Sequence, residues 1–280
     1  MTLVPTGELV AAAQARGGAV GAFNVVTLEH AEAIVSAAEA AGTGVILQIS
    51  ENAVRFHAGL VHPLAAACRS LASSAAAPVA LHLDHVTDAE LAGQAGPAGF
   101  SSLMFDAGAQ PYDENVAATA REAQRAHAAG LWVEAELGYV GGKPDQPRSA
   151  HEKGVRTDPD EAVAYVAATG VDALAVAVGS SHAMVTQTAR LDLELIGRLR
   201  AAVPVPLVLH GSSGVPDDEL RAAVSAGIAK VNVGTALGKA MTAAVRSALA
   251  DESLVDPRKY LAPARAAMAE AVAHVLAVLP

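Results

Sequence analysis

Short apolar segments alternate along the chain with longer segments in which Ala, Glu and Arg recur at helical spacing. Eight of the apolar segments are short, bounded by turn residues and rich in Val, Leu and Ala, so we predict that they are β-strands. The predicted strands are residues 18–23, 45–48, 79–83, 102–105, 132–137, 173–178, 207–210 and 230–233. Because they are almost continuously apolar, they indicate a parallel sheet that is covered on both faces.

Helices are predicted between these strands and after the last of them. The helical pattern is clear in residues 29–41, 115–129, 159–169, 192–202 and 216–226, and residues 260–279 form a further predicted helix. Eight strand–helix repeats predict an α/β fold, a single (β/α)₈ TIM barrel over residues 1–280 with an extra C-terminal helix. An open doubly wound sheet is the alternative, but residues 21–24 are not the glycine-rich phosphate fingerprint expected after its first strand.

Composition and charge narrow the classes of partner. The 280 residues are 52% hydrophobic and 17% charged, which suits a protein with a large core. The net charge of −10 argues against binding to nucleic acid or to an anionic membrane surface. Cys68 is the single cysteine, so it can form neither an internal disulfide nor a cysteine-based zinc site.

The sequence also predicts a cytoplasmic location. The N-terminus has no secretory signal pattern, and no apolar stretch of 18 residues is free of charge, residues 163–178 coming nearest. One cysteine in the whole chain fits a reducing compartment. We therefore expect neither a leader nor a membrane span.

Polar side chains collect at the carboxyl ends of the predicted strands, where barrel enzymes carry their chemistry. They are Asn24, Gln48, Ser50, Asp84, His85, Asp106, Glu134, Glu136, His182, His210, Asn232 and Thr235. Three of the ten histidines belong to this set, on three different strands. Three imidazoles with an open position are typical of a catalytic Zn²⁺ site, although each histidine alone could equally be an ordinary hydrogen-bonded side chain. Alternation places His82 beside Asp84, as a supporting residue.

Two adjacent loops are predicted to bind phosphate. Gly211, Ser212 and Ser213 follow one strand and precede a helix, so their backbone N–H groups can hold an anion. The segment from Lys230 to Thr235 forms the next strand and its end. Phosphate sites after strands 7 and 8 are frequent in barrels. Ordinary βα turns, which also favour Gly and Ser, are the alternative.

Five motifs, in register over about residues 2–270, resemble those of the class II, metal-dependent ketose-bisphosphate aldolases, which include fructose- and tagatose-bisphosphate enzymes. They are His82-Leu-Asp84-His85, Glu134-Ala-Glu136-Leu-Gly-Tyr-Val-Gly-Gly142, Ala173-Leu-Ala-Val-Ala-Val-Gly179-Ser-Ser-His182, Leu209-His210-Gly-Ser-Ser-Gly-Val-Pro216 and Lys230-Val-Asn232-Val-Gly-Thr235. Five separated motifs are far more specific than any one of them.

The resemblance implies a zinc-dependent lyase of carbohydrate metabolism. It would cleave or form a phosphorylated ketose through a zinc-stabilised enediolate of dihydroxyacetone phosphate. Zn²⁺, or another divalent metal, would be held by His85, His182 and His210, with Glu136 as an alternative ligand. Asp84 would be the catalytic acid that serves the aldehyde oxygen.

The resemblance also implies a set of substrate-binding positions. The implied substrate or phosphate contacts are Asn24, Ser50, Gly179, Ala183, Gly211, Ser212, Ser213, Asn232, Val233, Gly234 and Thr235. A monovalent cation would assist phosphate binding. The Ala-rich outer helices suggest a homo-oligomer, a dimer or a tetramer.

Two positions depart from the family pattern. The acidic residue that exchanges the enolate proton, expected just after the Gly-Gly pair, is Pro144 here, and Asp145 is the nearest substitute base. The glycine usual after the second metal histidine is Ala183.

Three alternatives to a metal-dependent aldolase are compatible with the sequence. A lysine Schiff base would stabilise it without a metal, but we expect no lysine at an interior-facing strand position, because Lys230 begins a strand at the end remote from the histidines. A metal-dependent phosphosugar isomerase or epimerase would use the same stabilisation without cleaving a carbon–carbon bond. A non-catalytic zinc-binding barrel is the third alternative, favoured by the loss of the acid at Pro144.

Overall fold

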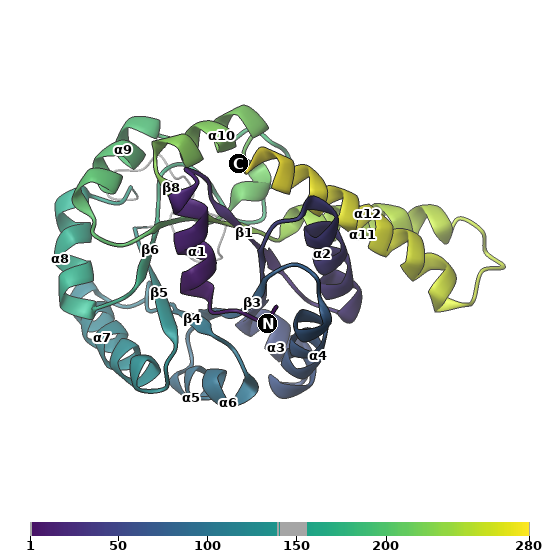
Figure 1. The fold of residues 1–280 in the computed structure, drawn as a ribbon, viewed down its shortest axis with the longest axis horizontal. Helices are drawn as coiled ribbons and strands as arrows, with labels where there is room; N and C mark the ends of the chain where they lie inside the picture. The colour runs from purple at the N-terminus through teal and green to yellow at the C-terminus, as the bar shows by residue number, and fades with distance from the viewer. Residues whose placement is uncertain (1, 139, 141–155, 280) are drawn as a thin grey trace.

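The computed structural model describes residues 2–138, 140 and 156–279, which contain a closed barrel of eight parallel strands. Each strand pairs with the next one along the chain, and β8 pairs with β1 to close the ring. Figure 1 looks down this ring, with the helices around its outside. The predicted (β/α)₈ barrel is therefore confirmed.

All eight predicted strands are present, with small differences at their ends. They are β1 (Val20–Asn24), β2 (Val45–Ser50), β3 (Val79–Val86), β4 (Ser102–Phe105), β5 (Trp132–Leu137), β6 (Ala173–Val176), β7 (Leu207–Leu209) and β8 (Ile228–Val233). The main difference is in β3, which continues past the predicted end at Leu83 to Val86. The pairing of β3 with β4 changes register between Leu83 and Val86, so the extension is irregular.

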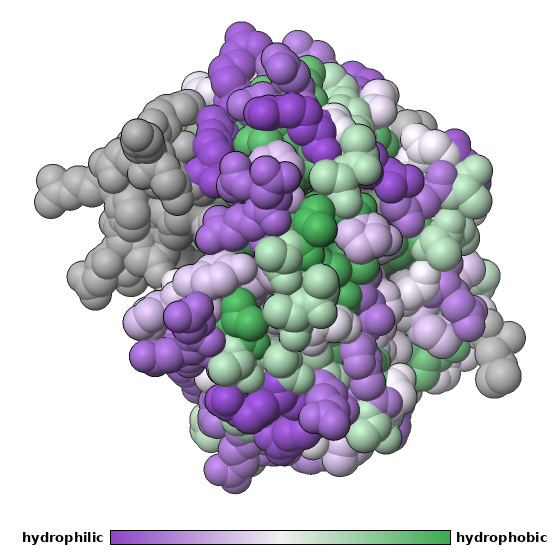
Figure 2. All heavy atoms as spheres, turned by 90° about the vertical axis from the view of Figure 1, so that its left-hand side faces the viewer, coloured by the Kyte–Doolittle hydropathy of each residue, from purple (hydrophilic) through white to green (hydrophobic). Residues whose placement is uncertain are grey.

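The five predicted inter-strand helices are confirmed within three residues at each end, and several further helices join them. The helices are α1 (Thr6–Ala15), α2 (Leu28–Ala41), α3 (Glu51–Phe56), α4 (His62–Ser74), α5 (Ala89–Gly93), α6 (Ala95–Ala98), α7 (Tyr112–Ala128), α8 (Pro159–Thr169), α9 (Leu193–Ala202), the 3₁₀ turn η1 (Ser212–Gly214), α10 (Asp217–Ala226), α11 (Thr235–Ala248) and α12 (Pro257–Val278). Seen from the side of α8, the outer surface mixes hydrophilic and hydrophobic side chains (Figure 2).

Helix α1 covers the amino-terminal end of the barrel. It lies across the centre of the ring in Figure 1, and its Val10 and Ala13 join a buried cluster with Ile46 and Ala80 from the strands. Thr6 of the same helix has its hydroxyl 2.6 Å from that of Ser102 on β4, inside the barrel. This end is therefore filled, and chemistry is left to the carboxyl ends of the strands.

Helices α11 and α12 form an arm that projects from the barrel (Figure 1). Among the described residues, α12 is the one helix that is long and apolar enough to cross a membrane by length and composition. It packs along α11 and α2, and its Met268 and Val272 are fully buried in the main core. The barrel and its neighbouring helices thus cover part of this apolar helix, 28% of its most apolar 18 residues.

Candidate active site

The three predicted metal histidines come together at the carboxyl end of the barrel. His85 lies on the extension of β3, His182 in the loop after β6, and His210 directly after β7. Their ring centroids are 4.9–5.8 Å apart. With Glu136 of β5 they offer four ligand atoms that lie within 4.8 Å of one another. The convergence predicted from the strand ends is thus confirmed, and it spans 125 residues of sequence, from position 85 to position 210.

Two carboxylates fix which ring nitrogen of His85 and His210 faces the centre. His85 Nδ1 lies 2.9 Å from Asp106 Oδ2, and His210 Nε2 lies 2.8 Å from Glu134 Oε1. If these nitrogens donate their protons, His85 Nε2 and His210 Nδ1 are left as lone-pair donors. A carboxylate behind each ligand histidine is the usual support of a metal site.

The donor set fits a divalent metal such as zinc. His210 Nδ1 lies 3.0 Å from Glu136 Oε2, at the place where an ion would draw both atoms toward itself. Burial would lower the pKa of His210, but hydrogen bonds to Glu134 and Glu136 outweigh it and raise this pKa to about 9. The two carboxylates beside His210 thus favour positive charge at this place.

The backbone is strained at two positions of the site. His85 has φ +49° and Ala183, directly after His182, has φ +58°, in the left-handed region that residues with a Cβ seldom adopt. The irregular end of β3 produces the first of these conformations and turns the His85 ring toward the centre. The second explains physically why a glycine suits position 183.

We expect Ala183→Gly to raise the free energy of unfolding by up to about 1 kcal/mol. Glycine removes a left-handed strain of about 1–2 kcal/mol, and its larger unfolded-state entropy offsets part of this gain. Thermal unfolding of the two proteins measures the difference. Ala58→Gly is a matched control, because Ala58 has φ +57° at an exposed turn. A loss of stability at 183 with a gain at 58 would contradict this account.

A layer of buried polar groups lies beneath the histidines. Lys230 belongs to this layer, contrary to the prediction from the sequence. That lysine is fully buried inside the barrel. Its Nζ donates to Glu134 Oε2 and to Asn232 Oδ1, both at 2.8 Å. The expectation that no lysine faces the interior is therefore wrong, because the barrel buries an ion pair there. Lys230 does not line the cavity, so its role is to balance Glu134.

Charges in this layer are tightly coupled. Burial opposes ionisation of Glu134, but the Lys230 ammonium and the hydrogen bond from His210 hold the pKa of this carboxyl far below its ordinary value. Burial, together with the charge of Lys230, lowers the pKa of His82 to about 3. His82 Nδ1 lies 2.8 Å from Ser102 Oγ, so His82 supports the polar layer below the three histidines.

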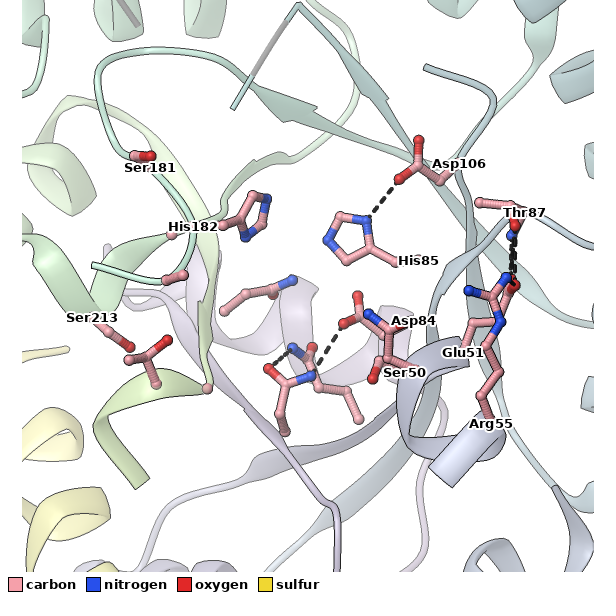
Figure 3. Close-up of a pocket in the computed structure, with 18 residues that line it drawn as sticks. Ser50, Glu51, Arg55, Asp84, His85, Thr87, Asp106, Ser181, His182 and Ser213 are labelled. Atoms are coloured by element: carbon pink, nitrogen blue, oxygen red, sulfur yellow. Dashed lines mark hydrogen bonds and ion pairs between the residues drawn. The ribbon is translucent and has the colours of Figure 1, made fainter. Parts of the chain in front are cut away.

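Asp84 lies at the mouth of the barrel, beside His85 (Figure 3). Its Oδ2 accepts a hydrogen bond of 3.2 Å from the Asn24 amide, which in turn accepts one of 3.0 Å from Gln48. Burial would raise the pKa of Asp84, but electrostatic interactions with His85, His82, His210 and Lys230 outweigh burial and lower it. Asp84 is therefore a carboxylate at neutral pH, held in one orientation with its Oδ1 available.

The two predicted phosphate loops meet at one side of the same cavity. Gly211 has φ +67°, and a Cβ there would come within 2.6 Å of the Ser181 backbone. A Cβ on Gly234 would come within 2.8 Å of Asn24 Oδ1. The 14-residue helix α11 begins at Thr235, with no acidic side chain in its first turn. Glycine is thus required for close approach, and the helix end favours an anion.

Most of the predicted site residues line one cavity of about 470 Å³, drawn in Figure 3. Those lining it are Asn24, Ser50, Asp84, His85, His182, Ala183, Gly211, Ser213, Asn232, Gly234 and Thr235. His210 and Glu136 lie buried just behind them. Ser212 and Val233 line a smaller cavity toward α12, and Ser212 donates to the Asn232 carbonyl.

The last two predicted positions are Gly179 and Asp145. Gly179 packs against Arg190 and Arg156, where a Cβ would come within 2.3 Å of the Arg190 carbonyl. The candidate base Asp145 lies outside the described residues.

Some residues of the site escaped prediction as functional. The sequence predicts Asp106 and Glu134 as polar strand ends without a role, and in the structure they are the partners of His85 and His210. The signal for Glu134 is its place two residues before Glu136, on the same face of β5. Three more residues line the cavity without being predicted from the sequence, namely Glu51, Arg55 and Thr87.

A closed (β/α)₈ barrel with three histidines and a glutamate gathered at its carboxyl end, in an arrangement that fits a metal ion, is the architecture of a metal-dependent barrel enzyme. The sequence matches the family described as fructose-bisphosphate aldolase class-II over residues 4–280. The chain therefore belongs to the class II fructose-bisphosphate aldolase family. It is a metal-dependent aldolase, a carbon–carbon lyase whose substrates are a phosphorylated ketose and an aldehyde.

Similar proteins cover almost the whole chain. A probable fructose-bisphosphate aldolase of Bacillus subtilis (strain 168) is 41% identical over 277 residues, 97% of this chain and 95% of the relative. A fructose-bisphosphate aldolase of Staphylococcus aureus is 39% identical over 276 residues, with the same coverage of both chains. The crystal structure of the YdjI aldolase from Escherichia coli K12 superposes with a TM-score of 0.86 at 33% identity, covering 99% of this chain and 97% of that one.

Proposed function

We propose that this aldolase cleaves and forms a ketose phosphate of the fructose- or tagatose-bisphosphate type, with Zn²⁺ as its metal. The convergence of His85, His182 and His210 at the carboxyl end of one barrel carries the proposal. Three imidazole nitrogens with a carboxylate nearby suit Zn²⁺. When bound, such an ion supplies a Lewis acid for the negative charge that develops on the ketone half of the substrate. A single domain over residues 1–280 and an assisting monovalent cation remain predictions.

Asp84 is the group that moves the proton of the aldehyde half. In cleavage, its carboxylate accepts the proton of the C4 hydroxyl as the bond between C3 and C4 breaks. In synthesis, it returns that proton to the aldehyde oxygen. The support is its buried position beside His85, its orientation by Asn24, and its lowered pKa, which keeps it ionised and ready to accept.

The loops after β7 and β8 hold the phosphate of the dihydroxyacetone unit. Gly211, Ser213, Gly234 and Thr235 all line this side of the cavity. Ser213 Oγ accepts a hydrogen bond of 3.1 Å from Ala236 N, which ties the first loop to the start of α11. Ala183, in the neighbouring loop, lines the same cavity.

Product identification tests this function. The zinc-loaded protein is assayed with fructose and tagatose bisphosphates and with other ketose phosphates, and the products are trapped by a coupled dehydrogenase. We expect triose phosphate from at least one substrate. If the product is an isomerised sugar and no triose phosphate is formed, the protein acts as an isomerase or epimerase and not as an aldolase. Zinc binding without proton exchange at the carbon of dihydroxyacetone phosphate would indicate a non-catalytic barrel.

His210→Ala should remove metal and activity together. His210 is fully buried and offers Nδ1 toward His85, His182 and Glu136, so its loss leaves two histidines and an unbalanced pair of carboxylates. We expect metal affinity, measured by competition with a chelator, to fall by more than about 10²-fold. Losing a residue that only supports a ligand costs about 10- to 100-fold, and the loss of a ligand itself should cost more. His274→Ala is the control, because His274 pairs with Asp217 on the outside. Full activity of His210→Ala without metal would refute the ligand role.

We also propose that the enzyme acts in the cytoplasm as a homo-oligomer, a dimer or a tetramer. The arm formed by α11 and α12 projects from the barrel (Figure 1), and it carries exposed Leu249 and Val255 at its far end. Light scattering after size-exclusion chromatography measures the state, and a monomer at micromolar concentration would contradict this proposal.

A further inference from the structure

The cavity has two ends on opposite sides of the metal centre. Ser213 follows β7, and Thr87 follows β3, four strands away in a ring of eight. Figure 3 shows Ser213 on one side of His182 and His85, and Arg55, Glu51 and Thr87 on the other. If the phosphate of the dihydroxyacetone unit occupies the first end, the aldehyde half extends toward the second. Asp84 lies on that path (Figure 3), as its proton transfer requires.

Arg55 is held in place at this second end by a buried carboxylate. Glu51 is 5% exposed, and its Oε2 accepts a bond of 2.6 Å from Thr87 N. The Thr87 hydroxyl donates to the same carboxylate at 3.0 Å, and the Arg55 guanidinium donates to Glu51 Oε1. The Arg55 side chain nevertheless stays 65% exposed. One edge of its guanidinium is anchored, and the side chain lines the cavity, so among the described residues its other donors have room to bind a ligand.

Arg55 is the group at this end of the cavity that can bind an anion. Three carboxylates line the cavity, namely Glu51, Asp84 and Asp106. Glu51 is neutralised by Arg55 and by backbone N–H groups, and Asp106 faces His85. Among the residues that the structure describes, Arg55 is the one Lys or Arg side chain in the lining. A planar guanidinium held on one edge is suited to bidentate binding of phosphate or carboxylate.

We propose that Arg55, oriented by Glu51 and Thr87, binds an anionic group at the far end of the aldehyde half and so selects the aldehyde. This inference rests on the proposed function, because it takes the orientation of the substrate from it. It assigns a specificity-determining residue to the anionic end of the aldehyde. Arg55 takes no part in the proton transfers, which stay with the residues around the metal.

Aldol synthesis with three aldehydes tests the inference. Arg55→Met is compared with the wild type in condensing dihydroxyacetone phosphate with glyceraldehyde 3-phosphate, with neutral glyceraldehyde, and with a carboxylate-bearing aldehyde, succinic semialdehyde. We expect kcat/KM to fall about 10- to 100-fold for the aldehyde with the preferred anion, the effect of losing hydrogen bonds to a charged group. For neutral glyceraldehyde we expect a change of less than about threefold. Whichever of the two anionic aldehydes loses more kcat/KM in Arg55→Met shows whether Arg55 binds a phosphate or a carboxylate.

Controls separate this inference from the proposed function. Arg16→Met removes an exposed arginine at the end of α1, whose guanidinium donates only to Ala12 O among described groups, and it should change none of the three reactions. Equal losses with all three aldehydes, or no loss with either anion, would overturn the role of Arg55. Proton exchange on dihydroxyacetone phosphate alone reports on the metal end. If the wild-type enzyme exchanges the proton but shows no preference for an anionic aldehyde, the proposed role of Arg55 is wrong and the proposed function stands. If the wild-type enzyme shows no exchange, the proposed function itself is wrong.

Discussion

Asp84→Asn is expected to lower kcat for ketose cleavage by about 10²- to 10⁴-fold, the range of general acid–base catalysis. Asparagine has nearly the same shape and can still accept the hydrogen bond that Asn24 donates to Oδ2. It cannot accept the proton of the C4 hydroxyl. The measurement is kcat in a coupled assay, together with the zinc content of the same sample, which should remain that of the wild type.

Proton exchange distinguishes this role from a general disturbance of the site. Exchange on dihydroxyacetone phosphate involves no aldehyde oxygen, so Asp84→Asn should retain far more exchange than cleavage. Loss of exchange and cleavage to the same degree would mean that Asp84 serves the metal half of the site instead. A wild-type kcat would remove the catalytic assignment.

Lys230→Met is expected to lower the free energy of unfolding of the metal-free protein by about 3–5 kcal/mol, because it leaves one partner of a buried ion pair uncompensated. Glu134 and Lys230 have no exposed surface and lie 2.8 Å apart. For a chain of this size the loss corresponds to a Tm lower by roughly 10 °C. Thermal unfolding measures it, with Lys259→Met on the exposed face of α12 as the control.

A second variant tests the cause of that loss. Lys230→Met combined with Glu134→Gln removes both charges and keeps an oxygen that accepts from His210 Nε2. We expect the double variant to recover at least half of the lost stability, because the unpaired carboxylate is gone. A double variant as unstable as Lys230→Met would show that packing or the bond to Asn232 matters more than charge.

The sequence predicted the fold and the mouth of the barrel for clear physical reasons. Buried parallel strands are apolar along their whole length, so each was visible as a segment. Closure of the ring then brings the strand ends together, which is why His85, His182 and His210 could be predicted to meet. Asp84 and the phosphate loops followed from the same rule.

The layer below the mouth could not be predicted in this way. A lysine near the start of a strand gives no sign that it faces inward, and its partner Glu134 lies 96 residues away. The strained backbone at His85 is likewise a product of the irregular pairing of β3 with β4. Glu51 and Arg55 lie one helical turn apart on α3, whereas Thr87 follows β3, and only the folded chain shows that Glu51 joins Thr87 to Arg55.

The buried pair of Glu134 and Lys230 also bears on protein engineering. His210 takes its orientation from Glu134, and Glu134 is tolerated inside the barrel only because Lys230 stands beside it. A design that transfers only the candidate metal ligands to a new scaffold would include His85, His182, His210 and Glu136. It would omit the buried ion pair of Glu134 and Lys230 that supports them. A functional design would therefore have to include Glu134 and Lys230 together with the ligands that they support.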